Sequence, residues 1–368
     1  MIIGINARNI LGSKMEGFGN YSYELVRRIT KNHPEQKFVL FFDRTVDPKF
    51  EFTSNVQTVV LYPPTRHPLL WILWFEWRLK RALKKYCVDV LWSPDGFCSL
   101  RSSVPQIATI HDLNFEHYPQ DLPWLVSRYF RFFFPKFARK AKRILTVSNF
   151  SKQDIVQTYG ISSTKISVVY NGISDEFREL TFEEVTKTRQ QYTNGKPYFL
   201  FVGSLHPRKN VQRLVQAFAE FSLDNSEIDL VIVGNAMWKQ EVFQLTNETK
   251  KRVHFLGHLT TNELSRVTGA AFALSYVPYF EGFGIPLVEA MRCGIPIVSA
   301  NTSCLPEIAG DAAIYCDPFS VKDITAQLHT LSNDSTLHEK LTEHALTRST
   351  LFCWDKAAEE VWDVLNKK

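Results

Sequence analysis

A nine-residue segment, EGFGIPLVE, begins with Glu281 and ends with Glu289. Gly282 and Gly284, which flank Phe283, let a ligand approach the backbone closely because glycine has no side chain. Two carboxylates this close together can accept hydrogen bonds from the hydroxyls of a sugar or a ribose, and the backbone amides between them can face a phosphate. The segment therefore contains groups suited to binding a phosphorylated sugar or a nucleotide.

Ile285 and Pro286 predict where the next helix begins. Proline is favoured in the first turn of a helix, where its missing N–H is not needed. We therefore expect Glu281 in a loop and Glu289 about one turn inside the helix, with both carboxylates on one side of the junction.

Arg208 and Lys209 form a second candidate site. They lie in GSLHPRKNVQRLVQAF, which starts at Gly203 directly after an apolar run and leads into a helical pattern. The N-terminus of a helix offers unpaired N–H groups and a partial positive charge, and two cationic side chains there strengthen its attraction for anions. This pattern predicts a diphosphate site.

The first half of the chain offers two further candidates. Gly17, Phe18 and Gly19 follow the first apolar run and precede a predicted helix, so they are expected to form a glycine loop that can close over a phosphate or a sugar. His111 and Asp112 come at the end of another run, at the rim of the predicted sheet, where His111 is placed to contact a sugar.

Apolar, β-rich runs recur along the chain with helical patterns between them, as is typical of buried parallel strands. In the first half they are IIGI (2–5), FVLFF (38–42), VQTVVL (56–61), VDVLWS (88–93), QIATIHD (106–112) and RILTVS (143–148). In the second half they are YFLFVGS (198–204), DLVIVG (229–234), VHFLG (253–257), FALSYVP (272–278), PIVSA (296–300) and AIYCDP (313–318). Two successive βα series predict an α/β protein with two Rossmann-like domains and a cleft between them.

Composition supports this reading. A chain of 368 residues is long enough for two cores, and 45% hydrophobic residues with 22% charged ones are ordinary for a soluble protein. No apolar run approaches the ~18 to 20 residues of a membrane span, and no signal peptide precedes the first run, so a cytoplasmic location is expected. The six cysteines include no C-x-x-C pair, so neither a zinc site nor a disulfide framework is indicated.

Charge is distributed unevenly. Residues 1–190 hold 27 Lys and Arg against 18 Asp and Glu, whereas the remainder holds 16 against 20. This asymmetry favours an anionic partner for the first half. Nucleic acid is not the expected partner, because no signature of a nucleic-acid-binding module occurs.

Taken together, these motifs resemble glycosyltransferases of family 4, which have the GT-B fold, use nucleotide-sugar donors and retain anomeric configuration. The resemblance runs through GFGNY (17–21), HDLNFEHYP (111–119), TVSNFSKQDI (146–155), VVYNGIS (168–174), GSLHPRKN (203–210), EGFGIPLVEAM (281–291) and LPEIAGDAA (305–313). It implies an acceptor-binding domain at 1–175, a donor-binding domain at 176–350, and a helix at 351–368 that packs back toward the N-terminal domain.

By this resemblance Glu289 would hold the donor ribose and Glu281 the hydroxyls of the transferred sugar. Arg208 and Lys209 would hold the diphosphate, and His111 would approach O6 of the transferred sugar. The remaining donor-binding residues would be Gly17, Phe18, Gly19, Asp112, Gly203, Gly282, Phe283, Gly284, Ile285 and Pro286. Since no Asp-x-Asp triplet occurs, no metal or other cofactor is expected, and cations with helix dipoles would stabilise the departing diphosphate.

Similarity to bacterial polysaccharide mannosyltransferases makes GDP-mannose the first candidate donor, with a saccharide or lipid-linked saccharide as the acceptor. UDP-glucose or another UDP-hexose is the alternative donor. A protein that binds a nucleotide sugar without transferring it is the alternative of another class.

Two segments, 67–86 and 123–144, combine Trp, Phe and Leu with clustered Lys and Arg, and the second has seven basic residues and no acid. Such a composition suits helices that lie in the interface of an anionic membrane, here the inner face of the cytoplasmic membrane. The alternative is that the aromatic residues belong to the core and the cations form a solvated face.

Overall fold

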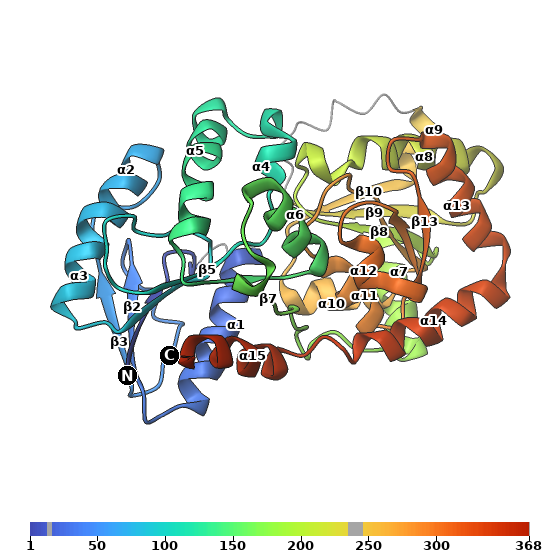
Figure 1. Cartoon of the computed structure of the whole chain (residues 1–368). Coiled ribbons are helices and arrows are strands. Elements are labelled where there is room, and N and C mark those ends of the chain that lie inside the picture. Colours follow the sequence, from blue (N-terminus) through green and yellow to red (C-terminus); the bar gives the residue numbers. More distant parts are fainter. Residues whose placement is uncertain (13–16, 235–245, 368) are drawn as a thin grey trace. The chain divides into compact units, whose positions relative to one another are not determined.

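The computed structural model describes residues 1–12, 17–234 and 246–367 (Figure 1). They form two compact units, the first made of Met1–Gly172 with Cys353–Lys368 and the second of Ile173–Phe352. Each unit contains one sheet whose strands are all parallel, with helices in the connections. The predicted fold class, an α/β protein with two Rossmann-like domains, is confirmed.

The first unit has a seven-stranded sheet in the order β3-β2-β1-β4-β5-β6-β7. Its strands are β1 (Ile2–Asn6), β2 (Lys37–Phe42), β3 (Val56–Val60), β4 (Val90–Ser93), β5 (Gln106–Thr109), β6 (Arg143–Thr146) and β7 (Ile166–Val168). On β1, Ile3 pairs with Phe38 on one side and Val90 on the other. Because the strand order reverses between β1 and β4, ligands in such a sheet bind near the loops that follow these strands.

The helices of the first unit are α1 (Gly17–Asn32), α2 (Pro68–Leu73), α3 (Lys80–Lys85), α4 (Asn114–His117), α5 (Trp124–Lys140), α6 (Asn149–Tyr159) and α15 (Trp354–Asn366). A π-helical turn, Trp74–Leu79, joins α2 to α3. The last helix, α15, packs on α1: Arg28 Nε lies 2.6 Å from Asp355 Oδ1, and the His33 ring stacks on Trp362 at 3.7 Å.

The second unit has a six-stranded sheet in the order β10-β9-β8-β11-β12-β13. Its strands are β8 (Tyr198–Val202), β9 (Asp229–Val233), β10 (Val253–Gly257), β11 (Ala273–Tyr276), β12 (Ile297–Ala300) and β13 (Ala313–Cys316). Its helices are α7 (Phe182–Thr193), α8 (Val211–Asp224), α9 (Asn247–Lys251), α10 (Thr261–Gly269), α11 (Ile285–Arg292), α12 (Leu305–Ala309), α13 (Val321–Asn333) and α14 (Ser335–Ser349). Here the order reverses between β8 and β11.

The central strands are buried along their whole length, which explains why they appear in the sequence as unbroken apolar runs. All five residues of β8 are buried, and so are all four of β11. A strand covered by helices on both faces has no side that favours polar residues. The runs of each half therefore mark the sheet from which the site residues project.

Two details of the first unit differ from the expectation. Gly17, Phe18 and Gly19 form the first turn of α1 and not a loop before it, because the helix already begins at Gly17. The edge strand β7 was missed, since it has only three residues and two of them are partly exposed. A short, half-exposed strand carries no strong apolar signal.

Candidate active site

The two central strands of the second unit bring together residues that are about 70 positions apart in the sequence. Arg208 and Lys209 follow β8, and Glu281 follows β11, which is the neighbour of β8 in the sheet. Because the carboxyl ends of parallel strands meet at one edge, the two loops lie against each other there. The backbone confirms the contact, since Tyr279 N donates a hydrogen bond of 3.1 Å to Arg208 O.

Glu281 forms the centre of an ion cluster. Its Oε1 lies 2.6 Å from Arg208 Nη1 and 2.6 Å from Lys209 Nζ, so both cations converge on one carboxylate oxygen. Lys209 Nζ also donates to the hydroxyl of Tyr276 at 2.6 Å. The Glu281 side chain is 8% exposed and that of Lys209 11%, so solvent weakens this cluster far less than it weakens a surface pair.

Burial alone would raise the pKa of Glu281, but the positive charges of Arg208 and Lys209 outweigh it and hold the pKa at about 2. The carboxylate is therefore ionised at neutral pH. An anionic ligand that reaches the two cations must compete with this internal counter-ion. A pyrophosphate group carries the charge to do so.

A short turn positions the two cations. Pro207–Lys209 forms a 3₁₀ turn that ends at Asn210, whose φ of +59° lies in the left-handed region that asparagine tolerates. The Asn210 side chain donates to Val277 O at 2.9 Å and to Pro318 O at 2.7 Å, which ties the turn to the loop after β11. Arg208 and Lys209 consequently precede the N-terminus of α8, as the sequence predicted.

The loop between the two glutamates is built on glycine. Gly284 has a φ of +87° and directly precedes α11, whose first turn contains Pro286 as expected. A Cβ at Gly284 would lie 3.0 Å from Leu305 and 3.1 Å from Leu287, so a larger residue would be both strained and crowded. The Phe283 side chain is buried edge-on against Phe352, so this residue can offer a ligand only its backbone.

The other donor-site candidates of this unit lie around the same loops. Gly203 is partly exposed after β8, with a φ of +153°, and a Cβ there would lie 3.7 Å from Lys209 Cδ. Gly282 is buried in the loop, whereas Ile285 and Pro286 are partly exposed at the start of α11. Gly282, Ile285 and Pro286 thus place small or apolar groups at or next to the N-terminus of α11.

Glu289 lies on α11 and is partly buried. Within the part of the chain that the structure describes, its carboxylate has no hydrogen-bond or ion-pair partner, and burial raises its pKa to about 7. The two glutamates thus differ sharply, because two cations neutralise Glu281 whereas no group among the described residues neutralises Glu289. A hydroxyl-bearing ligand would supply the missing donors.

We expect the affinity for a ligand whose hydroxyls bind the Glu289 carboxylate to fall as the pH drops below about 7. A pKa of about 7 leaves the Glu289 carboxyl mostly protonated at about pH 6, where charge-assisted hydrogen bonds from such hydroxyls are lost, so the dissociation constant should rise roughly tenfold relative to pH 8. Calorimetric titration at both pH values measures this, with a nucleotide sugar as the probe and not a nucleoside diphosphate, because a terminal phosphate itself titrates near pH 6. The Glu289→Gln variant should bind weakly and almost equally at both pH values. An unchanged pH dependence in that variant would rule Glu289 out as the titrating group.

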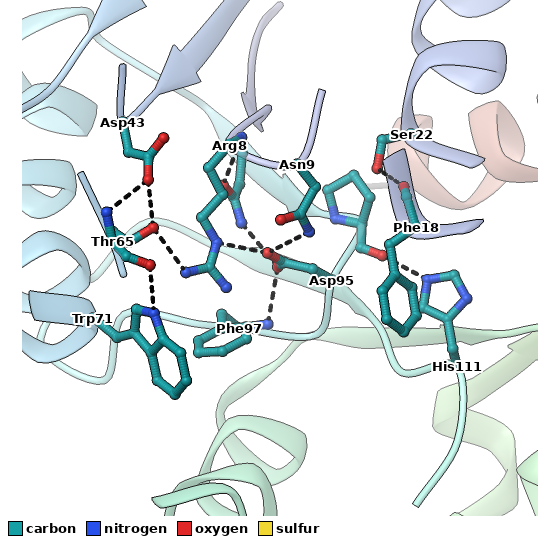
Figure 2. A network of polar contacts seen from close by, with 12 residues as sticks. Arg8, Asn9, Phe18, Ser22, Asp43, Thr65, Trp71, Asp95, Phe97 and His111 are labelled. Carbon is teal, nitrogen blue, oxygen red and sulfur yellow. Dashed lines mark hydrogen bonds and ion pairs between the residues drawn. The ribbon is translucent and has the colours of Figure 1, made fainter. Parts of the chain in front are cut away.

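His111 is the corresponding candidate of the first unit. It follows β5, and its Nε2 lies 2.7 Å from Pro94 O (Figure 2). The ring contacts Phe18 of α1 edge-on at 4.7 Å, so the predicted glycine segment and the predicted histidine are neighbours. Gly17 is exposed and Gly19 is buried, whereas Phe18 is half-exposed.

Asp112 has a local role. Its Oδ1 accepts a hydrogen bond of 3.0 Å from Asn114 N at the start of α4, so one oxygen of the carboxylate is already occupied.

The described residues, 1–12, 17–234 and 246–367, contain no group of three or more His, Cys, Asp or Glu side chains that is arranged to hold a metal ion. None of the six cysteines forms a disulfide in the described structure.

Sequence reasoning missed a polar network next to His111. Asp95, in the loop after β4, accepts hydrogen bonds from Arg8 at 2.8 Å and Asn9 at 3.1 Å, both of which follow β1 (Figure 2). The network continues through Thr65 to Asp43 at the end of β2. Their position in the sequence could have identified these residues as candidates, because each follows a predicted strand. They were missed because none belongs to a recognisable motif.

A second surface of the first unit is apolar and basic. Leu69 of α2 is 68% exposed and Trp124 of α5 is 72% exposed, and they line an open groove of about 1000 Å³ between these helices. Arg128 and Arg131 lie in the same groove. Part of each aromatic segment is nevertheless core, since Trp74 and Phe137 are buried. No helix in the described ranges is long and apolar enough to span a bilayer.

Comparison with known proteins gives two successive family matches. The model described as Glycosyltransferase Family 4 matches residues 15–177, and the model described as Glycosyl transferases group 1 matches residues 184–348. O-antigen chain mannosyltransferase B of Escherichia coli is 27% identical over 361 residues, which cover 94% of both chains. O-antigen chain mannosyltransferase RfbU of Salmonella typhimurium is 29% identical over 257 residues, which cover 68% of this chain and 67% of the relative.

Solved structures agree on the fold. HepE of Anabaena, determined with UDP and glucose, superposes with a TM-score of 0.76 at 18% identity, covering 100% of this chain and 99% of HepE. WaaG, a glycosyltransferase involved in lipopolysaccharide biosynthesis, superposes with a TM-score of 0.77 at 17% identity, covering 100% of both chains.

Proposed function

Since the chain belongs to the family 4 glycosyltransferases, with a group 1 glycosyl transferase region as its second half, we propose that it transfers mannose from GDP-mannose to a saccharide acceptor. The observation that carries the proposal is the convergence of Arg208 and Lys209 on Glu281, directly after the central strands β8 and β11. The similarity to O-antigen mannosyltransferases over almost the whole chain supports mannose as the sugar.

In this proposal the second unit binds the donor. Arg208 and Lys209 receive the diphosphate, with the backbone amides of the 282–284 loop, and Glu289 receives the ribose hydroxyls. Glu281 is released from part of its ion cluster and takes the hydroxyls of the mannose. For His111 of the first unit we propose contact with a sugar.

The chemistry follows from the charges. Departure of GDP concentrates negative charge on the β-phosphate, and fixed cations that are already in place stabilise it without reorganisation. We propose that Arg208 and Lys209 do this without a metal ion. We further propose retention of configuration, in which the departing phosphate oxygen accepts the proton of the acceptor hydroxyl on the same face of the sugar, so that one C–O bond breaks as another forms.

Identification of the donor tests the proposal. Mass spectrometry of nucleotides that co-purify with the protein, followed by a hydrolysis screen over GDP- and UDP-hexoses, should give GDP and hydrolysis of GDP-mannose. Exclusive use of a UDP-hexose would replace mannose by the alternative donor, of which UDP-glucose is the first to test. Tight binding without any hydrolysis or transfer would favour the non-catalytic alternative.

We also propose that the acceptor is presented at an anionic membrane surface. The groove between α2 and α5 exposes leucine and tryptophan beside arginines, and this combination favours insertion of the apolar side chains with the cations near anionic headgroups. A lipid-linked saccharide at the inner face of the cytoplasmic membrane fits such a surface.

Liposome flotation tests the membrane proposal with a matched pair of leucines. Leu69→Asp should lower binding to vesicles that contain anionic lipid by about tenfold, because insertion of one leucine is worth roughly 1.5 kcal/mol or more. Leu223→Asp is the control, since Leu223 is 80% exposed on α8 of the second unit and should leave binding unchanged. Equal recovery of the wild-type protein with neutral and anionic vesicles would contradict the proposal.

A further inference from the structure

The loop between β12 and α12 holds the backbone of Glu281 on both sides. Ser303 Oγ accepts a hydrogen bond of 3.1 Å from Glu281 N, and Cys304 Sγ donates one of 3.2 Å to Glu281 O. Because β12 pairs with β11 in the sheet, the loops that follow these two strands lie at the same edge. A loop that contains no predicted site residue therefore supports the central glutamate of the ion cluster.

The peptide group that joins Phe280 to Glu281 is fixed at both of its ends. Its N–H, on Glu281, donates to Ser303, and its carbonyl, on Phe280, accepts a hydrogen bond of 3.1 Å from Arg208 Nη1. A peptide group is planar, so its N–H and its carbonyl cannot turn independently. Ser303 consequently sets the direction in which the Phe280 carbonyl meets the guanidinium of Arg208.

The next peptide group, between Glu281 and Gly282, is held through its carbonyl by Cys304. With the peptide planes on both sides held, the φ and ψ of Glu281 are restricted, and with them the direction of its side chain. This direction matters because Glu281 Oε1 lies 2.6 Å from Arg208 Nη1 and 2.6 Å from Lys209 Nζ. A small rotation of the backbone would lengthen one of these two contacts.

Ser303 is itself oriented by its loop. Its hydroxyl donates to Thr302 O at 2.8 Å, so the oxygen is left to accept from Glu281 N. Thr302 Oγ1 donates in turn to Pro278 O at 3.2 Å, which ties the loop to the residues just after β11. These bonds present the serine oxygen as an acceptor at one fixed place.

The backbone of Ser303 is strained. Its φ of +54° lies in the left-handed region, which a residue with a Cβ adopts at an energetic cost. Such strain concentrates at functional sites, where the surrounding structure maintains it. Of the described residues other than glycine, four have a positive φ, and two of them, Asn210 and Ser303, lie in loops beside the ion cluster. Glycine at 303 would remove the strain but also the acceptor for Glu281 N.

We propose that Ser303 is a positioning residue, which through the Phe280–Glu281 peptide holds Arg208 and the Glu281 carboxylate in the arrangement that receives the diphosphate. This role rests on the proposed transfer and adds to it a requirement outside the EGFGIPLVE segment. All the residues involved belong to the second unit. Ser303 acts through the peptide group and not by contact with the reacting atoms.

Two substitutions separate the hydroxyl of Ser303 from the strain of its backbone. Ser303→Gly removes both, whereas Ser303→Ala removes the hydroxyl and keeps the strain. Both should lower kcat with GDP-mannose by about tenfold or more, because both release the same peptide group. In thermal unfolding, Ser303→Gly should be at least as stable as the wild type and Ser303→Ala less stable. A wild-type kcat in Ser303→Gly, with a loss only in the less stable Ser303→Ala, would show a purely structural role and overturn the proposal.

Ser320→Gly is the matched control. Ser320 is a partly exposed serine of the same unit, and its hydroxyl also accepts from a backbone N–H, that of Asp323 at 3.2 Å. Because this bond caps the start of α13, the variant should keep the kcat of the wild type. A loss of kcat as large as that in Ser303→Gly would contradict a specific role for Ser303.

A measurement that needs no transfer separates this proposal from the function. The ¹⁵N–¹H signal of Arg208 Nε, assigned by its loss in Arg208→Lys, should shift in Ser303→Gly and stay in place in Ser320→Gly. An unshifted signal in Ser303→Gly would overturn the positioning role even if GDP-mannose is the donor. A shifted signal, with no turnover of any nucleotide hexose, would uphold the positioning and reject the proposed function.

Discussion

Replacement of Glu281 by glutamine is expected to lower kcat by about 10²- to 10³-fold while GDP binds equally well or more tightly. Glutamine has nearly the same shape but no charge, so it cannot act as the counter-ion of Arg208 and Lys209. The two cations are then freer to bind the diphosphate. In the proposed transfer, departure of GDP leaves positive charge on the sugar, which a nearby carboxylate stabilises and an amide does not, so kcat should fall.

Steady-state kinetics with GDP-mannose and calorimetric titration with GDP check the two halves of this result separately. Glu220→Gln is a matched control, since Glu220 is an exposed glutamate on α8 of the same unit, and it should change neither quantity. A kcat within about twofold of the wild type in a folded Glu281→Gln protein would exclude Glu281 from the reaction. A loss of GDP binding as large as the loss of kcat would instead show that Glu281 maintains the structure of the binding site.

Lys209→Met is expected to weaken GDP binding by about 10²-fold and to lower kcat as well. A charge-assisted hydrogen bond is worth about 1.5 to 3 kcal/mol, and Lys209 is largely buried, so water cannot replace its charge. The loss in kcat should add to the loss in binding because the charge on the leaving diphosphate is greatest in the transition state. Methionine preserves most of the volume of the side chain, which limits structural damage.

Lys196→Met provides the comparison for Lys209→Met. Lys196 lies just before β8, at the amino end of the same strand, and its Nζ is 3.9 Å from Asp229 Oδ1. It therefore tests the loss of a lysine charge at the edge of the sheet that faces away from the site. Lys196→Met should bind GDP normally, and a similar weakening in both variants would show that net charge, and not position, determines affinity.

Much of the fold was predictable because its strands are buried on both faces. Runs such as YFLFV and ALSY contain no polar face to confuse the pattern, and they identified β8 and β11 with their order along the chain. The neighbour relations were not predictable in the same way. Whether β11 pairs with β8 depends on how the helices pack, and the sequence around each strand does not encode that partner.

The site was predictable residue by residue but not as an arrangement. Sequence reasoning gave Glu281 and the cations Arg208 and Lys209 separate ligands, whereas the structure joins them in one ion cluster. An ion pair between residues more than 70 positions apart leaves no local pattern. Similarly, Glu289 could be located on α11 from Pro286, but its raised pKa depends on burial and the absence of a nearby cation in the described structure.

The first unit shows the same limit more strongly. Arg8 and Asp95 are single residues in loops, and only the adjacency of β1 and β4 reveals that they form a buried pair. The glycine segment at Gly17 was placed correctly next to a helix but was read as a loop, because glycine usually ends regular structure. Here the helix incorporates it as the first turn.

The most direct test of the central claim is to incubate the purified protein with GDP-mannose, an acceptor saccharide and excess EDTA, and to follow the anomeric signals of the product by NMR. The account predicts that GDP is released at the same rate as without the chelator and that mannose appears in the α configuration of the donor. Release of GDP only after addition of a divalent metal, or a product with inverted configuration, would contradict it.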